Sequence, residues 1–204
     1  MALTQIELGM LKDGILTADT AGRLKVADGF VNSAKMAAGA ARANFGAGAV
    51  LQVVSTTKTD TFSSSSFNTW VDVTGLSVSI TPASASSKIL VLATVVYSGS
   101  SLSTGLMLRC LRGATEIGSG AAAGSRSTGF AGTEEIGNSG IYQTFSAPFN
   151  YLDSPSSTSS TTYKIQLNLI DNYGFAAINR SGVDNDGSTY PRTSSTITVM
   201  EIAA

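Results

Sequence analysis

The sequence predicts a mainly β protein: an antiparallel, jelly-roll-like β-sandwich preceded by a small irregular or helical N-terminal segment. Three observations support this prediction. Hydrophobic residues make up 43% of the 204 residues but charged residues only 13%, against about 25% charged in an average soluble protein. Short β-type runs alternate with stretches rich in Gly, Ser and Thr, which is typical of strands joined by turns. No convincing helical pattern lies between these runs, so a sandwich or jelly roll is the expected class.

The chain divides by composition into residues 1–49 and residues 50–204. In the first part, Asp13-Gly14-Ile15-Leu16 is echoed by Asp28-Gly29-Phe30-Val31, and each unit is typical of a tight turn, an apolar pair and a possible helix cap. A single unit cannot bury its apolar pair, whereas stacked repeats or neighbouring chains can. We therefore interpret residues 1–49 as an anchoring segment that contacts other proteins through Ile15, Leu16, Phe30 and Val31. A low-complexity tether is the alternative.

Strand signals begin at Val50 and continue to the end of the chain. Residues 76–80 and 161–169 alternate apolar and polar side chains, the pattern of a strand with one buried face. A turn is expected at Thr74-Gly75, between two strands. The further predicted strands are residues 51–54, 70–73, 105–112, 115–117, 141–147, 151–153, 175–178 and 195–202.

The run Lys88 to Tyr97 differs from the other strands because it is apolar on both faces. Such a strand is expected to be covered on both sides, by the second sheet and by a neighbouring subunit. The sequence therefore predicts a homotrimer with cyclic closure.

Several classes of partner are disfavoured by charge and hydropathy. The net charge is −1, the isoelectric point is near 5.3 and no basic cluster is present, so nucleic acid is not an expected partner. The start of the chain lacks the pattern of a signal peptide. The longest apolar run, Ile89 to Tyr97, is about half of the ~20 residues that a membrane-spanning helix needs. We expect a soluble protein made in a cytoplasm, without membrane insertion.

Catalytic chemistry finds few candidate residues in this sequence. The chain contains no histidine, which removes Ser-His-Asp and Cys-His catalysis and most zinc sites. Its single cysteine, Cys110, lies in a strand-like run and is expected in the core. Trp70, with Phe67 nearby, could form a sugar-stacking platform, but the core is the favoured interpretation. Glu134-Glu135 is interpreted as a solvated patch. We predict a protein that is not an enzyme and needs no cofactor.

Asp184-Asn185-Asp186-Gly187 is similar to the opening of a calcium loop, in which oxygen ligands alternate before a glycine. The bidentate Glu expected at loop position 12 is replaced by Ser195, so a surface turn is the favoured interpretation and no metal is expected.

Six segments carry a family resemblance. They are residues 51–62, 73–82, 86–91, 151–155, 162–166 and 195–198, which together span most of residues 50–204. These segments resemble a module of virion structural proteins of tailed phages, cyanophages included, and the Asp-Gly repeats are similar to connector repeats of tail-fibre and head-fibre chains. The resemblance implies a trimeric C-terminal head on an N-terminal anchor to other virion proteins, but no particular receptor.

We expect a short tail fibre that attaches the virion to the host surface. A capsid decoration or head-fibre protein is the alternative, and a polysaccharide-degrading spike is a remote third because such enzymes need paired carboxylates in a groove. Recognition is expected on the loops, chiefly 118–140 and 180–192. The second is richer in directional hydrogen-bonding groups, so we predict receptor binding, for example to a host surface glycan, by Asn179, Arg180, Asp184, Asp186, Tyr190 and Arg192. A merely solvated connection is the alternative.

Overall fold

A computed structural model of the chain describes residues 16–18, 24–26, 47–134 and 140–204. The chain separates into two compact units, Met1–Phe45 and Gly46–Ala204. In the first unit, strands β1 (Leu16–Ala18) and β2 (Leu24–Val26) pair antiparallel, with Leu16 opposite Val26. The described part of this unit is therefore a short β ribbon, where the sequence suggested irregular or helical structure.

Of the four residues predicted to anchor the chain, only Leu16 belongs to the described residues, as the first residue of β1. Ile15, Phe30 and Val31 lie outside them. Their anchoring role stays a prediction.

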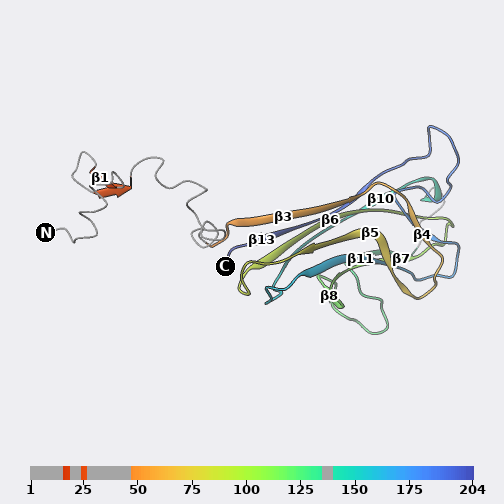
Figure 1. Cartoon of the computed structure of the whole chain (residues 1–204). Coiled ribbons are helices and arrows are strands. Elements are labelled where there is room, and N and C mark those ends of the chain that lie inside the picture. The colour runs from red at the N-terminus through yellow and green to blue at the C-terminus, as the bar shows by residue number, and fades with distance from the viewer. Residues whose placement is uncertain (1–15, 19–23, 27–46, 135–139) are drawn as a thin grey trace. The chain divides into compact units, whose positions relative to one another are not determined.

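The second unit is an antiparallel β-sandwich, as predicted (Figure 1). One sheet has six strands and the other has five. The six-stranded sheet contains β3 (Val50–Lys58), β4 (Phe62–Ser64), β6 (Lys88–Gly99), β10 (Phe145–Asp153), β12 (Ala176–Ile178) and β13 (Ser195–Ile202). The five-stranded sheet contains β5 (Trp70–Ile80), β7 (Leu106–Arg112), β8 (Thr115–Ile117), β9 (Ala131–Thr133) and β11 (Thr161–Leu169). A 3-10 turn, η1 (Gly140–Tyr142), precedes β10.

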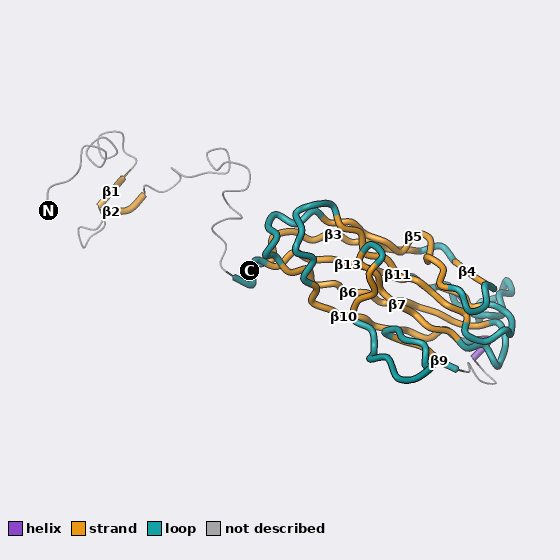
Figure 2. Tube along the Cα trace, turned by 90° about the horizontal axis from the view of Figure 1, so that it is seen from below, coloured by secondary structure: helices purple, strands orange, loops and turns teal. Residues whose placement is uncertain are grey.

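The order of the strands places β6 at the centre of the six-stranded sheet. Along one side β6 pairs with β13 and, nearer its end, with β12; along the other side it pairs with β10. β3 and β10 therefore flank the sheet formed by β13 and β6, and these four strands lie side by side (Figure 2). In the other sheet β11 lies between β5 and β7.

The core lies between the two sheets and is built from the alternating positions of each strand. Ile89, Val91 and Val95 of β6 are fully buried, as are Ile165 and Leu167 of β11. Burial of these aliphatic side chains supplies the main stabilisation, at about 25 cal/mol per Å² of apolar area. The opposite face of β6 is only partly covered: Leu90 and Leu92 are half-buried.

A polar network around the buried Asp153 carboxylate joins β10 of one sheet to β7 and β11 of the other. The Tyr163 hydroxyl donates a hydrogen bond of 2.7 Å to Asp153 Oδ2, and Arg112 Nη1 lies 2.7 Å from Asp153 Oδ1. Asp153 is only 3% exposed. Because both of its oxygens are engaged, the carboxylate is satisfied in the interior.

The predicted turn at Thr74-Gly75 is wrong, because β5 runs through both residues. Gly75 has φ +82°, and β5 changes register against β11 at this point: Ser77 faces Lys164 whereas Asp72 faces Gln166. The extra residues form a bulge, for which glycine supplies the left-handed conformation. The turn signal thus marks an irregularity within one long strand.

The predicted strand at residues 141–147 also needs correction. Ile141 and Tyr142 belong to η1, and the strand begins at Phe145 and continues without a break to Asp153. Pro148 lies within it, which is tolerated because, among the strands that the structure describes, β10 pairs with β6 alone and forms an edge. Within the described residues, no helix has the length and apolar character needed to cross a bilayer.

Candidate functional site

The loop between β12 and β13 contains all six residues predicted to bind a receptor, and it starts at Asn179. This residue has φ +63° and is fully buried. Its Nδ2 donates to the carbonyls of Lys58 (2.8 Å) and Asp60 (2.9 Å), and its Oδ1 accepts from Ser195 Oγ (2.6 Å). Asn179 is therefore a structural residue that fixes both ends of the loop to the sandwich. Because its side chain is fully buried, Asn179 cannot contact a receptor at the surface, unlike the exposed residues of the loop.

Arg180 also supports the loop from within. Its side chain is 13% exposed and lies 3.2 Å from Asp184 Oδ2. The guanidinium packs 4.8 Å from the centre of the Phe175 ring, which is a cation–π contact. An antiparallel bridge between Arg180 and Arg192 closes the base of the loop. Arg180 thus positions Asp184, and most of its charge faces inward.

Asp184 receives a second arginine from the other side of the loop. Arg192 Nη1 pairs with Asp184 Oδ1, and 54% of the Arg192 side chain is exposed. One carboxylate is thereby shared between two guanidinium groups, and the exposed Asp186 carboxylate balances the second positive charge. Arg192 retains free donors that face solvent.

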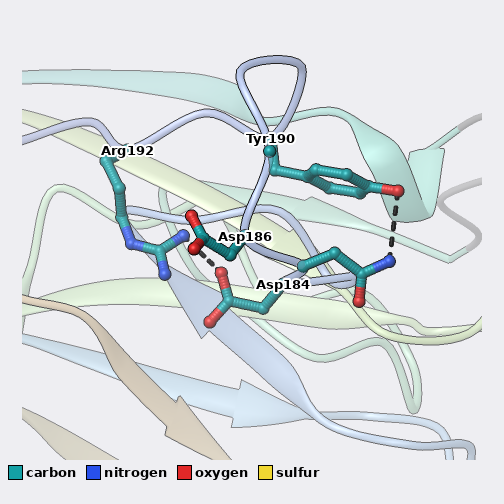
Figure 3. A pocket seen from close by; sticks show the side chains of 6 residues that line it. Asp184, Asp186, Tyr190 and Arg192 are labelled. Atoms are coloured by element: carbon teal, nitrogen blue, oxygen red, sulfur yellow. Dashed lines mark hydrogen bonds and ion pairs between the residues drawn. The ribbon is translucent and has the colours of Figure 1, made fainter.

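A hollow of about 380 Å³ opens beside these ion pairs (Figure 3). It is lined by Asp184, Asn185, Asp186, Gly187, Tyr190 and Arg192. Asn185 Nδ2 donates to the Tyr190 hydroxyl at 3.2 Å, and the Tyr190 backbone N–H donates to the Gly187 carbonyl at 3.0 Å. Figure 3 shows the Tyr190 ring along one side of the hollow, with the carboxylates of Asp184 and Asp186 beside the Arg192 guanidinium.

The structure adds one aromatic that sequence reasoning missed. Tyr142, 52% exposed, lies with its ring centre 6.5 Å from that of Tyr190. The Val183 backbone N–H donates to the Ile141 carbonyl at 2.8 Å, which ties η1 to the loop. The sequence pattern assigned Tyr142 to a strand, and no local signal shows that η1 lies beside a loop so distant in the chain.

The chemistry of the hollow suits a neutral polar ligand. Asp186 is an exposed acceptor, Arg192 is an exposed donor and Tyr190 offers a flat apolar face. Sugar hydroxyls donate to carboxylates and accept from guanidinium groups, while the C–H face of the ring stacks on aromatics. A calcium ion fits less well, because both arginines engage Asp184. Among the described residues, no three His, Cys, Asp or Glu side chains form a metal-binding group.

The remaining sequence candidates lie elsewhere. Cys110 is buried in the core, and burial, with a contribution from Asp153, raises the pKa of its thiol to about 12. The Arg109 guanidinium covers the Trp70 ring at 4.2 Å, and Phe67 is 47% exposed. Glu134 lines a separate hollow of about 250 Å³ with Ser103, Asp171 and Tyr173. Glu135 lies outside the described residues.

No family model and no curated protein matches this chain. Among solved structures, the chain is similar to the infectious bursal disease virus VP2 subviral particle, with a TM-score of 0.38 and 15% sequence identity. The match covers 75% of this chain and 38% of that one, so the chain spans well under half of that protein's length. Fold and site together define an antiparallel β-sandwich domain with a polar hollow in one loop.

Proposed function

We propose that this chain is a structural subunit of a phage virion, a short tail fibre, and that its sandwich attaches the particle to the host surface. The family resemblance of residues 50–204 suggests the virion role. The difference between the two ends of the sandwich supports attachment.

The two ends of the sandwich differ in a way that carries this proposal. At one end the chain enters the sandwich beside its C-terminus: Gly48 N–H donates to the Ala203 carbonyl and Ala203 N–H to the Ala49 carbonyl, both at 2.8 Å. At the other end Lys58 lies opposite Ser195, and its carbonyl accepts a hydrogen bond from Asn179 Nδ2 in the β12–β13 loop. The nine residues of β3 separate these ends, which corresponds to about 30 Å at ~3.4 Å per residue. The hollow thus lies opposite the place where the preceding segment joins.

An attachment subunit needs this separation, since one end connects to the particle while the other contacts the host. In the proposal, residues 1–49 bind other virion proteins and three copies assemble into one fibre. The hollow binds a host surface glycan through Asp186, Tyr190 and Arg192. The proposal includes binding but no chemical reaction, since the Asp184 carboxylate is engaged by two arginines.

Gold-labelled antibody against the sandwich, applied to intact particles, tests this assignment. Label at the tail is the expected result. Label distributed over the capsid would assign the chain to shell decoration, and particles without label would contradict a virion role.

A further inference from the structure

The two outer faces of the sandwich have opposite chemistry. On the five-stranded sheet, Lys164 Nζ and Gln166 Nε2 both donate to the Asp72 carboxylate, at 2.8 and 2.7 Å. These hydrogen bonds lower the pKa of Asp72, the bond from Lys164 most strongly. Arg109 Nε extends the network to Gln166 Oε1 at 2.8 Å. We therefore interpret the outer face of the five-stranded sheet, with its connected charged and polar side chains, as a face exposed to solvent.

The outer face of the six-stranded sheet carries a different row of side chains. Cross-strand pairing places Val53 opposite Met200, Met200 opposite Leu90 and Leu90 opposite Leu152. The row takes one residue from each of β3, β13, β6 and β10 in turn, and these four strands lie side by side (Figure 2). Its two ends protrude: Val53 is 54% and Leu152 is 55% exposed.

The next two rows along the same face are also uncharged. They consist of Ser55, Thr198, Leu92 and Asn150, followed by Thr57, Thr196, Thr94 and Pro148. A hollow of about 250 Å³ lies among them, between β13, β6 and β10. The face therefore combines protruding aliphatic side chains with a depression a few residues away.

We infer that this face is where copies of the chain contact one another, with the aliphatic row of one copy against the hollow of a second. This inference rests on the proposed function, which requires assembly of three copies. The absence of charged side chains from these three rows supports a second copy of the chain as the partner. Two identical surfaces bring identical charges together, and like charges in contact cost several kcal/mol; here all three rows are neutral.

The three rows form the centre of such a contact. They extend from Leu90 to Thr94 of β6 and across four strands, which corresponds to about 330 Å² at ~3.4 Å per residue and ~4.8 Å per strand. A standard protein interface buries about 800 Å² on each partner, so the rows supply about 40% of that area.

Two substitutions on the full-length chain test the inference by multi-angle light scattering. In the face variant Val53→Glu/Leu152→Glu, the most exposed ends of the row receive charge, so the sandwich itself is little affected. In the control variant Thr74→Glu/Thr162→Glu, the same charge is added to exposed positions of the five-stranded sheet. We expect three chains per particle for the wild type and the control, and one chain for the face variant.

The outcomes separate the two proposals. A trimeric face variant would overturn the interface but leave trimeric assembly intact. A monomeric wild type would contradict trimeric assembly, and the interface with it. If the Glu variant unfolds, as judged by circular dichroism, Val53→Ser/Leu152→Ser replaces it. This milder variant should dissociate at a concentration at least about tenfold higher than the wild type does, and an unchanged dissociation constant would overturn the inference.

Discussion

Ser195 Oγ donates a hydrogen bond of 2.6 Å to Asn179 Oδ1 in the buried base of the β12–β13 loop. The same Ser195 oxygen accepts from the Val96 backbone N–H at 2.9 Å. The first residue of the loop is thereby fixed to the first residue of β13 and to the central strand β6. The exposed tip of the loop is held on a rigid base.

Replacing Asn179 with Ala should destabilise the sandwich strongly. The change removes the acceptor of the Ser195 hydroxyl proton and the amide donor to the carbonyls of Lys58 and Asp60, and it puts alanine into a left-handed conformation. Together these effects should lower the free energy of unfolding by about 2–4 kcal/mol. Urea denaturation measures the loss. Asn185→Ala is the matched control, since this exposed residue of the same loop should change stability by less than about 0.5 kcal/mol. Equal stability of both variants would contradict a structural role for Asn179.

Cys110 should be unreactive in the folded chain. Burial raises the pKa of its thiol from 9.0 to about 12, so the nucleophilic thiolate is scarce at pH 8. A chromogenic disulfide reagent should label it only after denaturation. Rapid labelling of the folded protein would show that this part of the core opens.

The same pKa shift predicts a dependence of stability on pH. Because the folded state keeps the thiol proton that the unfolded state releases, the free energy of unfolding should fall as the pH rises from 9 toward 12. Tyr163 contributes in the same direction, since burial and its hydrogen bond to Asp153 raise its pKa. Cys110→Ala should make this decline shallower, although it lowers stability at pH 7. Parallel declines in the wild type and the variant would contradict the assignment.

Deleting residues 1–46 should leave the sandwich folded, because Gly48 and Ala49 keep their backbone bonds to Ala203. The truncated chain should show the same β circular dichroism and cooperative unfolding as the full chain, but should not be incorporated into particles. Loss of the β spectrum on truncation would show that the first 46 residues are needed for folding of the sandwich.

The long strands could be predicted from the sequence because their alternation reflects burial of one face. β11 and β13 follow the expected bounds closely, with Ile165 and Ile197 facing the core. The short strands β4 and β9 were missed. Each has three residues and little apolar character, so pairing with a distant strand, rather than local pattern, determines them.

Composition alone led to the candidate loop but could not predict how its residues are arranged. Density of hydrogen-bonding residues selected the β12–β13 loop, whose role in binding stays a prediction, yet it could not separate Asn179, which is buried, from Asp186, which is exposed. Short-range sequence does not reveal that Lys58 and Asp60 present carbonyls to Asn179, since these contacts depend on the register of β3 against β13. The contact of Tyr142 with Tyr190 also depends on tertiary structure, because η1 is brought to the loop by residues far apart in the chain.

Adsorption of particles to host cells tests the attachment role most directly. Particles with Tyr190→Ala/Arg192→Ala should adsorb at least about tenfold more slowly, with unchanged particle yield and thermal stability, because the substitutions remove an aromatic face and a donor from the hollow. Tyr173→Ala/Arg126→Ala removes the same residue types from exposed positions outside the hollow and should adsorb like the wild type. Wild-type adsorption of the Tyr190/Arg192 variant would contradict attachment through this loop.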